Sequence, residues 1–329
     1  MFSPRAIHHL IKYFNSIDKK LSGYFIRRPP WDEEPLTRMF FDLLDRDYQE
    51  EEKIDYTLNQ LYSDLSESDD PIAINISLDT RQYSKSYEHK VSKSDIGLIL
   101  EYQDQFNRKN SFTSYLLFQA KRLFPIHGEY TIRSKFDSFN KDQHDEIIRL
   151  NEWAESNFVS YLLYCPRPEK LDKTTRESLA YARNEFLGDN IFDFTFGQEL
   201  RDDLLNGSKT IAAGIFVSEV NKMPSEFYKI HNNVFRGITP FSWFIVQLFQ
   251  GKDARPLLNK LNQESYIYNY DYSEDDKIKC IREIVEGSLS QLSKRKLGND
   301  DISINENMLP KHTLKIKIIN GVDRNNFMK

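Results

Sequence analysis

The residues of this chain best suited to chemistry lie in two short segments, Asp95 in the sequence DIGLIL and the tripeptide Gln119, Ala120 and Lys121 in the sequence LLFQAK. A carboxylate, an amide oxygen and a main-chain carbonyl are oxygen ligands of the kind that Mg²⁺ and Mn²⁺ prefer. Hydrolysis of a phosphodiester requires such a cation, which neutralises developing charge, and a positioned water that attacks. We therefore expect a metal on Asp95, Gln119 and the Ala120 carbonyl, with Lys121 beside the attacking water.

Two predicted strands must position these residues. Residues 95 to 100 and 115 to 121 are apolar runs, and the polar segment DQFNRKNS between them is typical of a loop, so we expect a hairpin. Gln119 and Lys121 are two residues apart, and in a strand their side chains point to the same face. If Asp95 begins the antiparallel neighbour, its carboxylate reaches that face at the same end of the sheet.

The rest of the chain predicts a mixture of helices and strands. Further strands are expected at 72 to 78, 159 to 165, 211 to 218 and 314 to 319. Further helices are expected at 54 to 66, 142 to 155, 169 to 187, 197 to 206, 240 to 250 and 274 to 296. The first half of the chain thus has the order helix, three strands, helix, strand, and the second half is mostly helical.

Two more helices are expected near the start of the chain, before the one at 54 to 66. Residues 1 to 31 form a basic amphipathic segment that Pro29 and Pro30 separate from an acidic stretch, and Asp32 can begin the second helix. We expect the first helix either to dock on another subunit or to cover the core of its own domain. The predicted domains are 1–31, a docking helix and linker; 32–168, the catalytic domain; and 169–329, a helical accessory region for assembly.

Composition limits the possible functions. The chain has 329 residues, of which 39% are hydrophobic, which is enough for a sizeable core and excludes general disorder. The formal charge of −5 argues against a surface that binds nucleic acid everywhere, so such contacts must be local, metal-assisted or shared with a partner subunit. With no apolar run of about 18 residues and no signal peptide, we expect a soluble cytoplasmic protein without membrane contact.

Through DIGLIL, LLFQAK and the helices and strands around them, the sequence resembles the PD-(D/E)xK nuclease superfamily over residues 32 to 165. The resemblance implies an α/β fold, with a mixed central sheet flanked by helices, and a site that binds Mg²⁺ or Mn²⁺. It assigns metal binding to Asp95 and Gln119, positioning of the water to Lys121, and the acid of a preceding helix to Glu33 or Glu34. A glutamine on the following helix is also seen in the superfamily, which makes Gln143 a site candidate.

The sequence departs from the family pattern at two positions. Gln119 replaces the usual acid, which removes one negative ligand, and Ser94 stands where some relatives have proline. Versions with the pattern QxK resemble restriction and defence nucleases, and the helical additions resemble effector nucleases of bacterial anti-phage systems of the Lamassu type. That resemblance implies an endonuclease acting on DNA within an oligomer or a complex with partner subunits, including a separate ATPase sensor.

Other interpretations of the same residues stay open. Asp95 can simply begin a strand, Lys121 can be a solvated charge at a strand end, and Glu33 and Glu34 are favoured in a first helical turn by the helix dipole. Two further functions are a subunit that keeps a nuclease-like sheet only for assembly, and a nuclease that acts on RNA. The chemistry of the site does not distinguish DNA from RNA.

Overall fold

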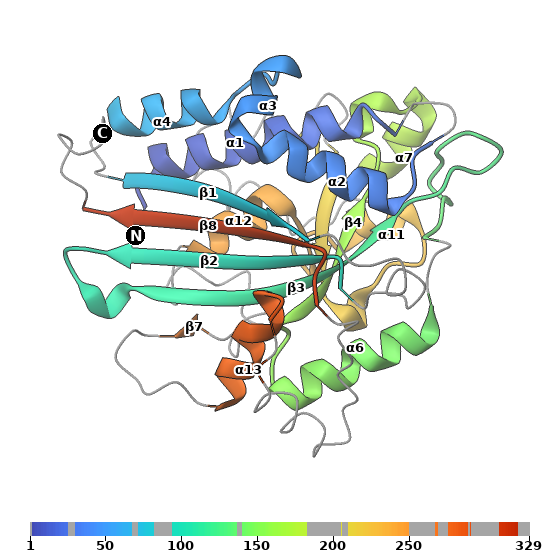
Figure 1. Cartoon of the computed structure of the whole chain (residues 1–329). Helices are drawn as coiled ribbons and strands as arrows, with labels where there is room; N and C mark the ends of the chain where they lie inside the picture. The colour runs from blue at the N-terminus through green and yellow to red at the C-terminus, as the bar shows by residue number, and fades with distance from the viewer. Residues whose placement is uncertain are drawn as a thin grey trace. The chain divides into compact units, whose positions relative to one another are not determined.

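The computed structural model confirms the α/β class expected from the sequence. Its sheet is mixed and flanked by helices, with the strand order β1-β8-β2-β3-β4-β5-β6 and the two-residue strand β7 paired with β3 (Figure 1). The structure describes residues 2–25, 30–67, 72–81, 94–136, 140–182, 205, 210–249, 267–268, 276–288, 290 and 309–321.

The strands lie where the apolar runs predicted them, with small shifts at their ends. The four strands expected in the first half are β1 (Ile72–Thr80), β2 (Ile96–Asp104), β3 (Phe112–Arg122) and β4 (Val159–Tyr164). The second half holds β5 (Ile215–Ser218), β6 (Ile238–Pro240), β7 (Ile267–Tyr268) and β8 (His312–Asn320). Of these, β5 and β8 were expected, whereas β6 and β7 are too short to give a clear pattern.

The described α-helices are α1 (Pro4–Ser22), α2 (Glu33–Leu44), α3 (Arg46–Glu51), α4 (Leu58–Glu67), α6 (Lys141–Ala154), α7 (Lys173–Ala182), α11 (Phe227–Asn232), α12 (Phe241–Phe249) and α13 (Asp276–Val285). The helix expected at 197 to 206 lies outside the described residues except for residue 205, as does most of 286 to 296. Among the described helices, none has both the length and the apolar character needed to cross a membrane.

By its internal contacts the chain divides into two compact units that alternate along the sequence. Unit 1 comprises residues 1–70, 121–139 and 162–258, and unit 2 comprises residues 71–120, 140–161 and 259–329. Strands β3 and β4 each continue from one unit into the other. The functional ranges expected from the sequence, 1–31, 32–168 and 169–329, stay a prediction.

In unit 2, the last strand of the chain lies inside the sheet. Strand β8 pairs in parallel with β2 and antiparallel with β1, and β2 forms the expected antiparallel hairpin with β3 (Figure 1). Only a glycine fits at position 97 of β2 without a shift, because a Cβ there would lie 2.7 Å from the Val285 carbonyl oxygen at the end of α13. The glycine of DIGLIL thus permits the close approach of α13 to the sheet.

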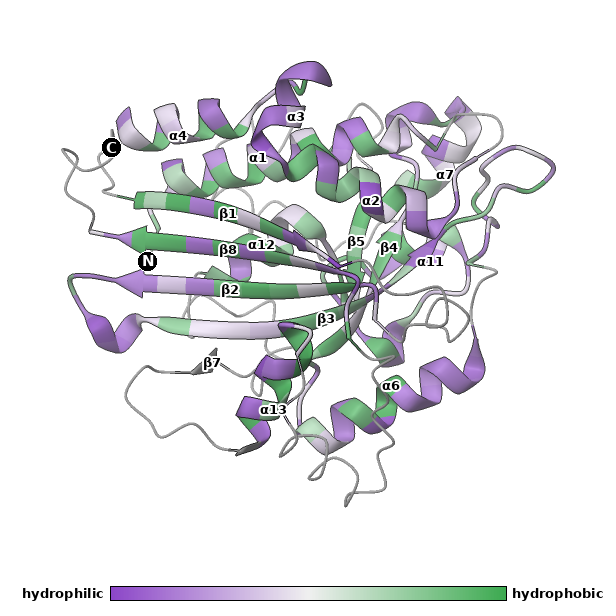
Figure 2. Ribbon diagram, in the orientation of Figure 1, coloured by the Kyte–Doolittle hydropathy of each residue, from purple (hydrophilic) through white to green (hydrophobic). Residues whose placement is uncertain are grey.

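Helix α6 also belongs to unit 2, and its pattern shows why it forms. The side chain of Asn140 caps its first turn by accepting from the main-chain nitrogens of Asp142 and Gln143. Its buried residues, Gln143, Ile147, Leu150 and Ala154, follow helical spacing and form one face. Figure 2 shows this amphipathic character as alternating hydrophilic and hydrophobic bands along α6, and β8 also carries bands of both kinds.

In unit 1, α1 is part of the core. It packs against α2, α4 and α12, and its buried apolar residues are Ala6, Ile7, Leu10, Ile11, Tyr13, Phe14, Ile17 and Leu21. Its apolar face is therefore covered by its own chain, which is the second of the two alternatives considered from the sequence. Docking of α1 on another subunit would have to use exposed residues, such as Arg5, Lys12 and Lys19.

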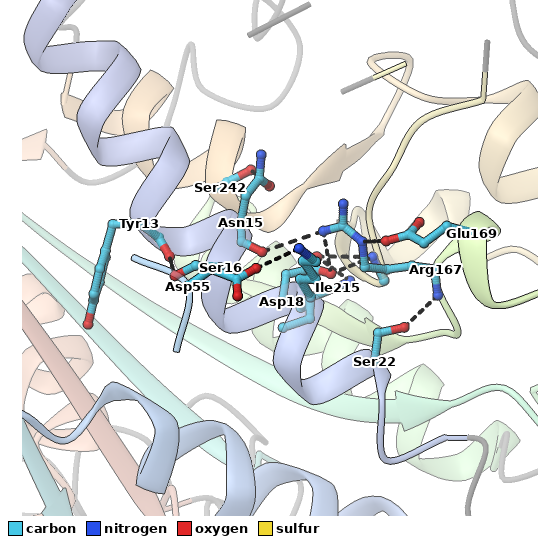
Figure 3. Close-up of polar contacts among 12 residues, drawn as sticks. Tyr13, Asn15, Ser16, Asp18, Ser22, Asp55, Arg167, Glu169, Ile215 and Ser242 are labelled. Carbon is cyan, nitrogen blue, oxygen red and sulfur yellow. Dashed lines mark hydrogen bonds and ion pairs between the residues drawn. The ribbon is translucent and has the colours of Figure 1, made fainter. Parts of the chain in front are cut away.

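A buried ion pair fixes α1 within unit 1 (Figure 3). Asp18 is 4% exposed, and its carboxylate accepts from the main-chain nitrogens of Gly214 and Ile215 at 2.9 to 3.0 Å. The same carboxylate lies 3.3 Å from the Arg167 guanidinium, which also contacts Glu169 at 2.6 Å. Burial raises the pKa of Asp18, and Arg167 and the two N–H groups oppose that shift. The network thus connects α1 to the segment after β4 and to the start of β5.

We predict that Asp18→Ala lowers the free energy of unfolding by about 3 to 5 kcal/mol, because it leaves a buried guanidinium and two buried N–H groups without the carboxylate. Urea unfolding followed by circular dichroism measures the change. The matched control is Asp55→Ala, which removes an exposed partner of Lys19 and should cost less than about 1 kcal/mol. Equal losses from the two substitutions would show that the network does not stabilise the unit.

A second buried titratable group of unit 1 is His231 on α11. Its side chain is 0% exposed and packs edge-on against the rings of Phe216 and Phe227. Among the residues that the structure describes, neither ring nitrogen has a hydrogen-bond partner. Burial lowers the pKa of His231 to about 3, from 6.5, so this imidazole is neutral in the folded protein.

This burial predicts acid sensitivity of the fold. Below pH 6.5 the unfolded chain protonates His231 and the folded chain does not, so stability is lost as the pH falls from 6.5 towards 3. Relative to His231→Phe, the wild-type protein should lose up to about 3 kcal/mol between pH 6.5 and pH 4. Urea unfolding at several pH values measures this, with His8→Gln on α1 as the control; parallel curves for wild type and His231→Phe would contradict it.

Candidate functional site

The hairpin of β2 and β3 holds Asp95 beside Gln119. In the antiparallel register Ile96 pairs with Phe118, so Asp95 stands next to the pair at the end of β2. Its main-chain nitrogen donates to the Phe118 carbonyl at 2.8 Å, and its main-chain oxygen accepts from the His312 nitrogen at 3.1 Å. Asp95 is therefore fixed on both sides, by β3 and by β8.

The Asp95 carboxylate receives two N–H groups from β3. Its Oδ2 accepts from the Gln119 side-chain nitrogen, Nε2, at 2.5 Å and from the Ala120 main-chain nitrogen at 2.8 Å. Hydrogen bonds to an ionised oxygen are stronger than those between neutral groups. Gln119 is 4% exposed, so these bonds lie in a largely buried environment. The structure thus brings together Asp95, Gln119 and Ala120, although Ala120 contacts the carboxylate through its N–H and not through the carbonyl that was expected as a ligand.

Gln143 joins this group from α6. Its Nε2 donates to Gln119 Oε1 at 2.8 Å, and it is 6% exposed. The cap by Asn140 sets the start of α6, which places Gln143 in the first turn of the helix, facing the sheet. A continuous polar chain therefore runs from Gln143 through Gln119 to Asp95, all within unit 2.

Lys121 follows on the same strand. Two residues after Gln119 in β3, its side chain projects on the same side of the strand as that of Gln119. It is 4% exposed, whereas lysines are almost never fully buried without a partner. This burial argues against the alternative interpretation of Lys121 as a solvated charge at a strand end.

Within unit 1, the structure distinguishes the two candidate glutamates. Glu33 is half-buried, and its Oε1 accepts from the Arg122 main-chain nitrogen at 3.3 Å, at the end of β3. Glu34 is exposed. Both residues stand in the first turn of α2, where the helix dipole favours acids, and they differ in their exposure and in the contact that Glu33 makes with Arg122.

Arg122 is a buried cation that the sequence reasoning missed. It is 1% exposed, its guanidinium donates to the carbonyl oxygens of Trp31 and Leu123, and its Cζ lies 4.2 Å from the centre of the Phe124 ring. These contacts fix the segment before α2 to the end of β3. A charge directly after Lys121 in a buried strand was the signal that could have identified it.

The oxygen atoms of Asp95 and its neighbours are of the kind that binds a hard cation such as Mg²⁺. Among the described residues, no three His, Cys, Asp or Glu side chains form a group that could hold a metal. Mg²⁺ is commonly held by only one or two carboxylates together with substrate phosphates, and the Asp95 carboxylate with the amide oxygens of Gln119 and Ala120 is compatible with that. As the structure has it, Gln119 turns its amino group rather than its oxygen towards Asp95, so metal binding requires this amide to rotate.

Comparisons with known proteins return no match: no family model, no curated protein and no solved structure is similar to this chain. The resemblance to the PD-(D/E)xK superfamily therefore stays a prediction from the sequence.

Proposed function

We propose that this chain is a metal-dependent endonuclease that hydrolyses phosphodiester bonds in DNA. The observation that carries the proposal is the contact between the Asp95 carboxylate and Gln119 on the strand that continues into Lys121. The α/β sheet with flanking helices is compatible with a PD-(D/E)xK core. We also propose that the chain acts as the effector of an anti-phage complex, with protein partners that include an ATPase sensor.

Each residue has a distinct task in this proposal. Asp95 supplies the negative oxygen for Mg²⁺ or Mn²⁺, and Gln119 and the Ala120 carbonyl supply neutral ones. The cation, when bound, neutralises charge on the phosphate and makes a bound water easier to deprotonate. Lys121 orients the attacking water and stabilises negative charge as it develops. Glu33 is the second acid, which we assign through its contact with Arg122 alone.

The presence of Gln119 in place of an acid affects the number of metal ions that the proposed site would hold. One carboxylate fewer lowers the negative charge that attracts a cation, so the proposal favours a single ion over a pair. The same replacement also motivates the competing function of an assembly subunit without activity. The hydrogen bond from Gln119 to Asp95 gives each of these side chains a partner. It would therefore hold the hairpin together without any metal.

We predict that the purified chain cleaves plasmid DNA with Mg²⁺ or Mn²⁺, and that Lys121→Met lowers the rate at least about a hundredfold. Methionine keeps the volume of this buried side chain but not its charge, so thermal unfolding of the variant is measured as well, and the rates are compared where the variant is folded. Lys317→Met on β8 is the matched control, because Lys317 pairs with Glu101 away from Asp95.

Three outcomes distinguish the functions in this assay. Full cleavage by Lys121→Met would remove the catalytic role of Lys121. Cleavage of single-stranded RNA but not of plasmid DNA would favour the RNA-directed alternative. No cleavage of either substrate, together with no binding of Mn²⁺, would favour the assembly subunit.

A second prediction concerns the acids of α2. Glu33→Gln keeps an oxygen that can accept from the Arg122 nitrogen, so the fold should persist, but the loss of the charge should slow cleavage about tenfold or more. Glu34→Gln, in the exposed neighbouring position, should stay within about twofold of wild type. Initial rates at saturating Mg²⁺ measure both. The reverse ranking would move the second acid to Glu34.

A further inference from the structure

The chain of amides at the candidate site has a direction. Gln143 donates through Nε2 to Gln119 Oε1 at 2.8 Å, and Gln119 donates through Nε2 to Asp95 Oδ2 at 2.5 Å. Each side-chain amide carries donors on one atom and an acceptor on the other. The atom that Gln143 presents therefore determines the atom that Gln119 turns towards Asp95.

We propose that Gln143 is a positioning residue that sets the orientation of the Gln119 amide and thereby controls metal affinity at Asp95. This inference rests on the proposed function, because it concerns the same metal site. It assigns Gln143 no contact with metal or substrate.

The coupling follows from the atoms that face one another. A cation bound by both Asp95 and Gln119 needs the Gln119 oxygen on the Asp95 side, so the Gln119 amino group must then face Gln143. If Gln143 kept its amino group there, two N–H donors would meet across a contact that is now 2.8 Å. Both side chains are buried, so neither can turn to water instead. The two amides must therefore rotate together.

The position of Gln143 suits this role. Asn140 caps α6 through the main-chain nitrogens of Asp142 and Gln143, so the helix start does not depend on the Gln143 side chain. Ile147 and Leu150 pack the same face of α6. A change in the Gln143 side chain should therefore alter its hydrogen bond with Gln119 while leaving the helix in place.

The test is the dissociation constant of Mn²⁺, measured by isothermal titration calorimetry on the full chain. Four proteins form a cycle: wild type, Gln143→Met, Gln119→Glu, and the double variant. Methionine fills the space of Gln143 but cannot donate to Gln119 Oε1, so it removes the bond that keeps the Gln119 oxygen away from Asp95, and Mn²⁺ binding should tighten several-fold. A carboxylate at position 119 presents oxygen on both sides and needs no orientation. In that background Gln143→Met should change the constant less than about twofold.

The variant Gln143→Glu keeps the contact with Gln119 and fixes which atom of the Gln119 amide faces position 143. Gln143→Glu can only accept, so it should hold the Gln119 amino group towards position 143 and retain Mn²⁺ binding at least as tight as wild type. Melting temperatures of all variants, measured without metal, show whether each is folded. Gln143→Glu and Gln143→Met remove the same N–H donor. If Gln143 had only a structural role, both substitutions should weaken Mn²⁺ binding.

The outcomes separate this inference from the proposed function. Wild-type chain that binds no Mn²⁺ would overturn the metal site and the inference with it. Mn²⁺ binding that Gln143→Met leaves unchanged or weakens, or tightens equally in both backgrounds, would overturn the positioning role and leave the proposed function standing. Tightening confined to the Gln119 background, with Gln143→Glu binding Mn²⁺ at least as tightly as wild type, supports the inference.

Discussion

The parallel pairing of β8 with β2 is the constraint on which the arrangement of unit 2 depends. This ladder aligns Ile96 with His312, while the other edge of β8 pairs with β1. Without β8, β2 would lose one of its two neighbours, and β1 would lose the described strand with which it pairs. The same pairing reaches the candidate site, because the Asp95 carbonyl accepts from the His312 nitrogen. The main-chain position of Asp95 is thus set by β3 and β8, and its carboxylate is held by two N–H groups of β3.

Buried polar groups are used differently in the two units. In unit 1, Asp18 meets a guanidinium and two main-chain N–H groups, so its charge is opposed by fixed donors and serves the packing of α1. In unit 2, Asp95 accepts from one main-chain N–H, that of Ala120, and also from a side-chain amide that can turn and that meets another amide. Main-chain donors cannot rotate, so they stabilise one arrangement of hydrogen bonds. Two side-chain amides in contact can rotate together, so they permit two arrangements. This difference separates a structural carboxylate from one that can serve a ligand.

The sequence predicted what depends on local pattern and missed what depends on distant pairing. Apolar runs and a polar loop were enough to predict the hairpin that joins Asp95 and Gln119, because its two strands are neighbours along the chain. The choice between Glu33 and Glu34 required the contact with Arg122, which no periodicity records. An apolar stripe on α1 is the same for a core helix and a docking helix, so burial against α2, α4 and α12 had to come from the structure. The insertion of β8 between β1 and β2 likewise leaves no local signal.

That insertion also determines when the candidate site can exist. A ribosome makes the chain from its N-terminus, so β2 and β3 are complete long before residues 312 to 320 are made. Until then β2 lacks its parallel neighbour, and Asp95 lacks the main-chain bond from His312. A nascent or prematurely truncated chain would therefore carry Asp95, Gln119 and Lys121 without the strand that sets the place of Asp95. Synthesis of β8 is thus the step that completes the main-chain setting of Asp95.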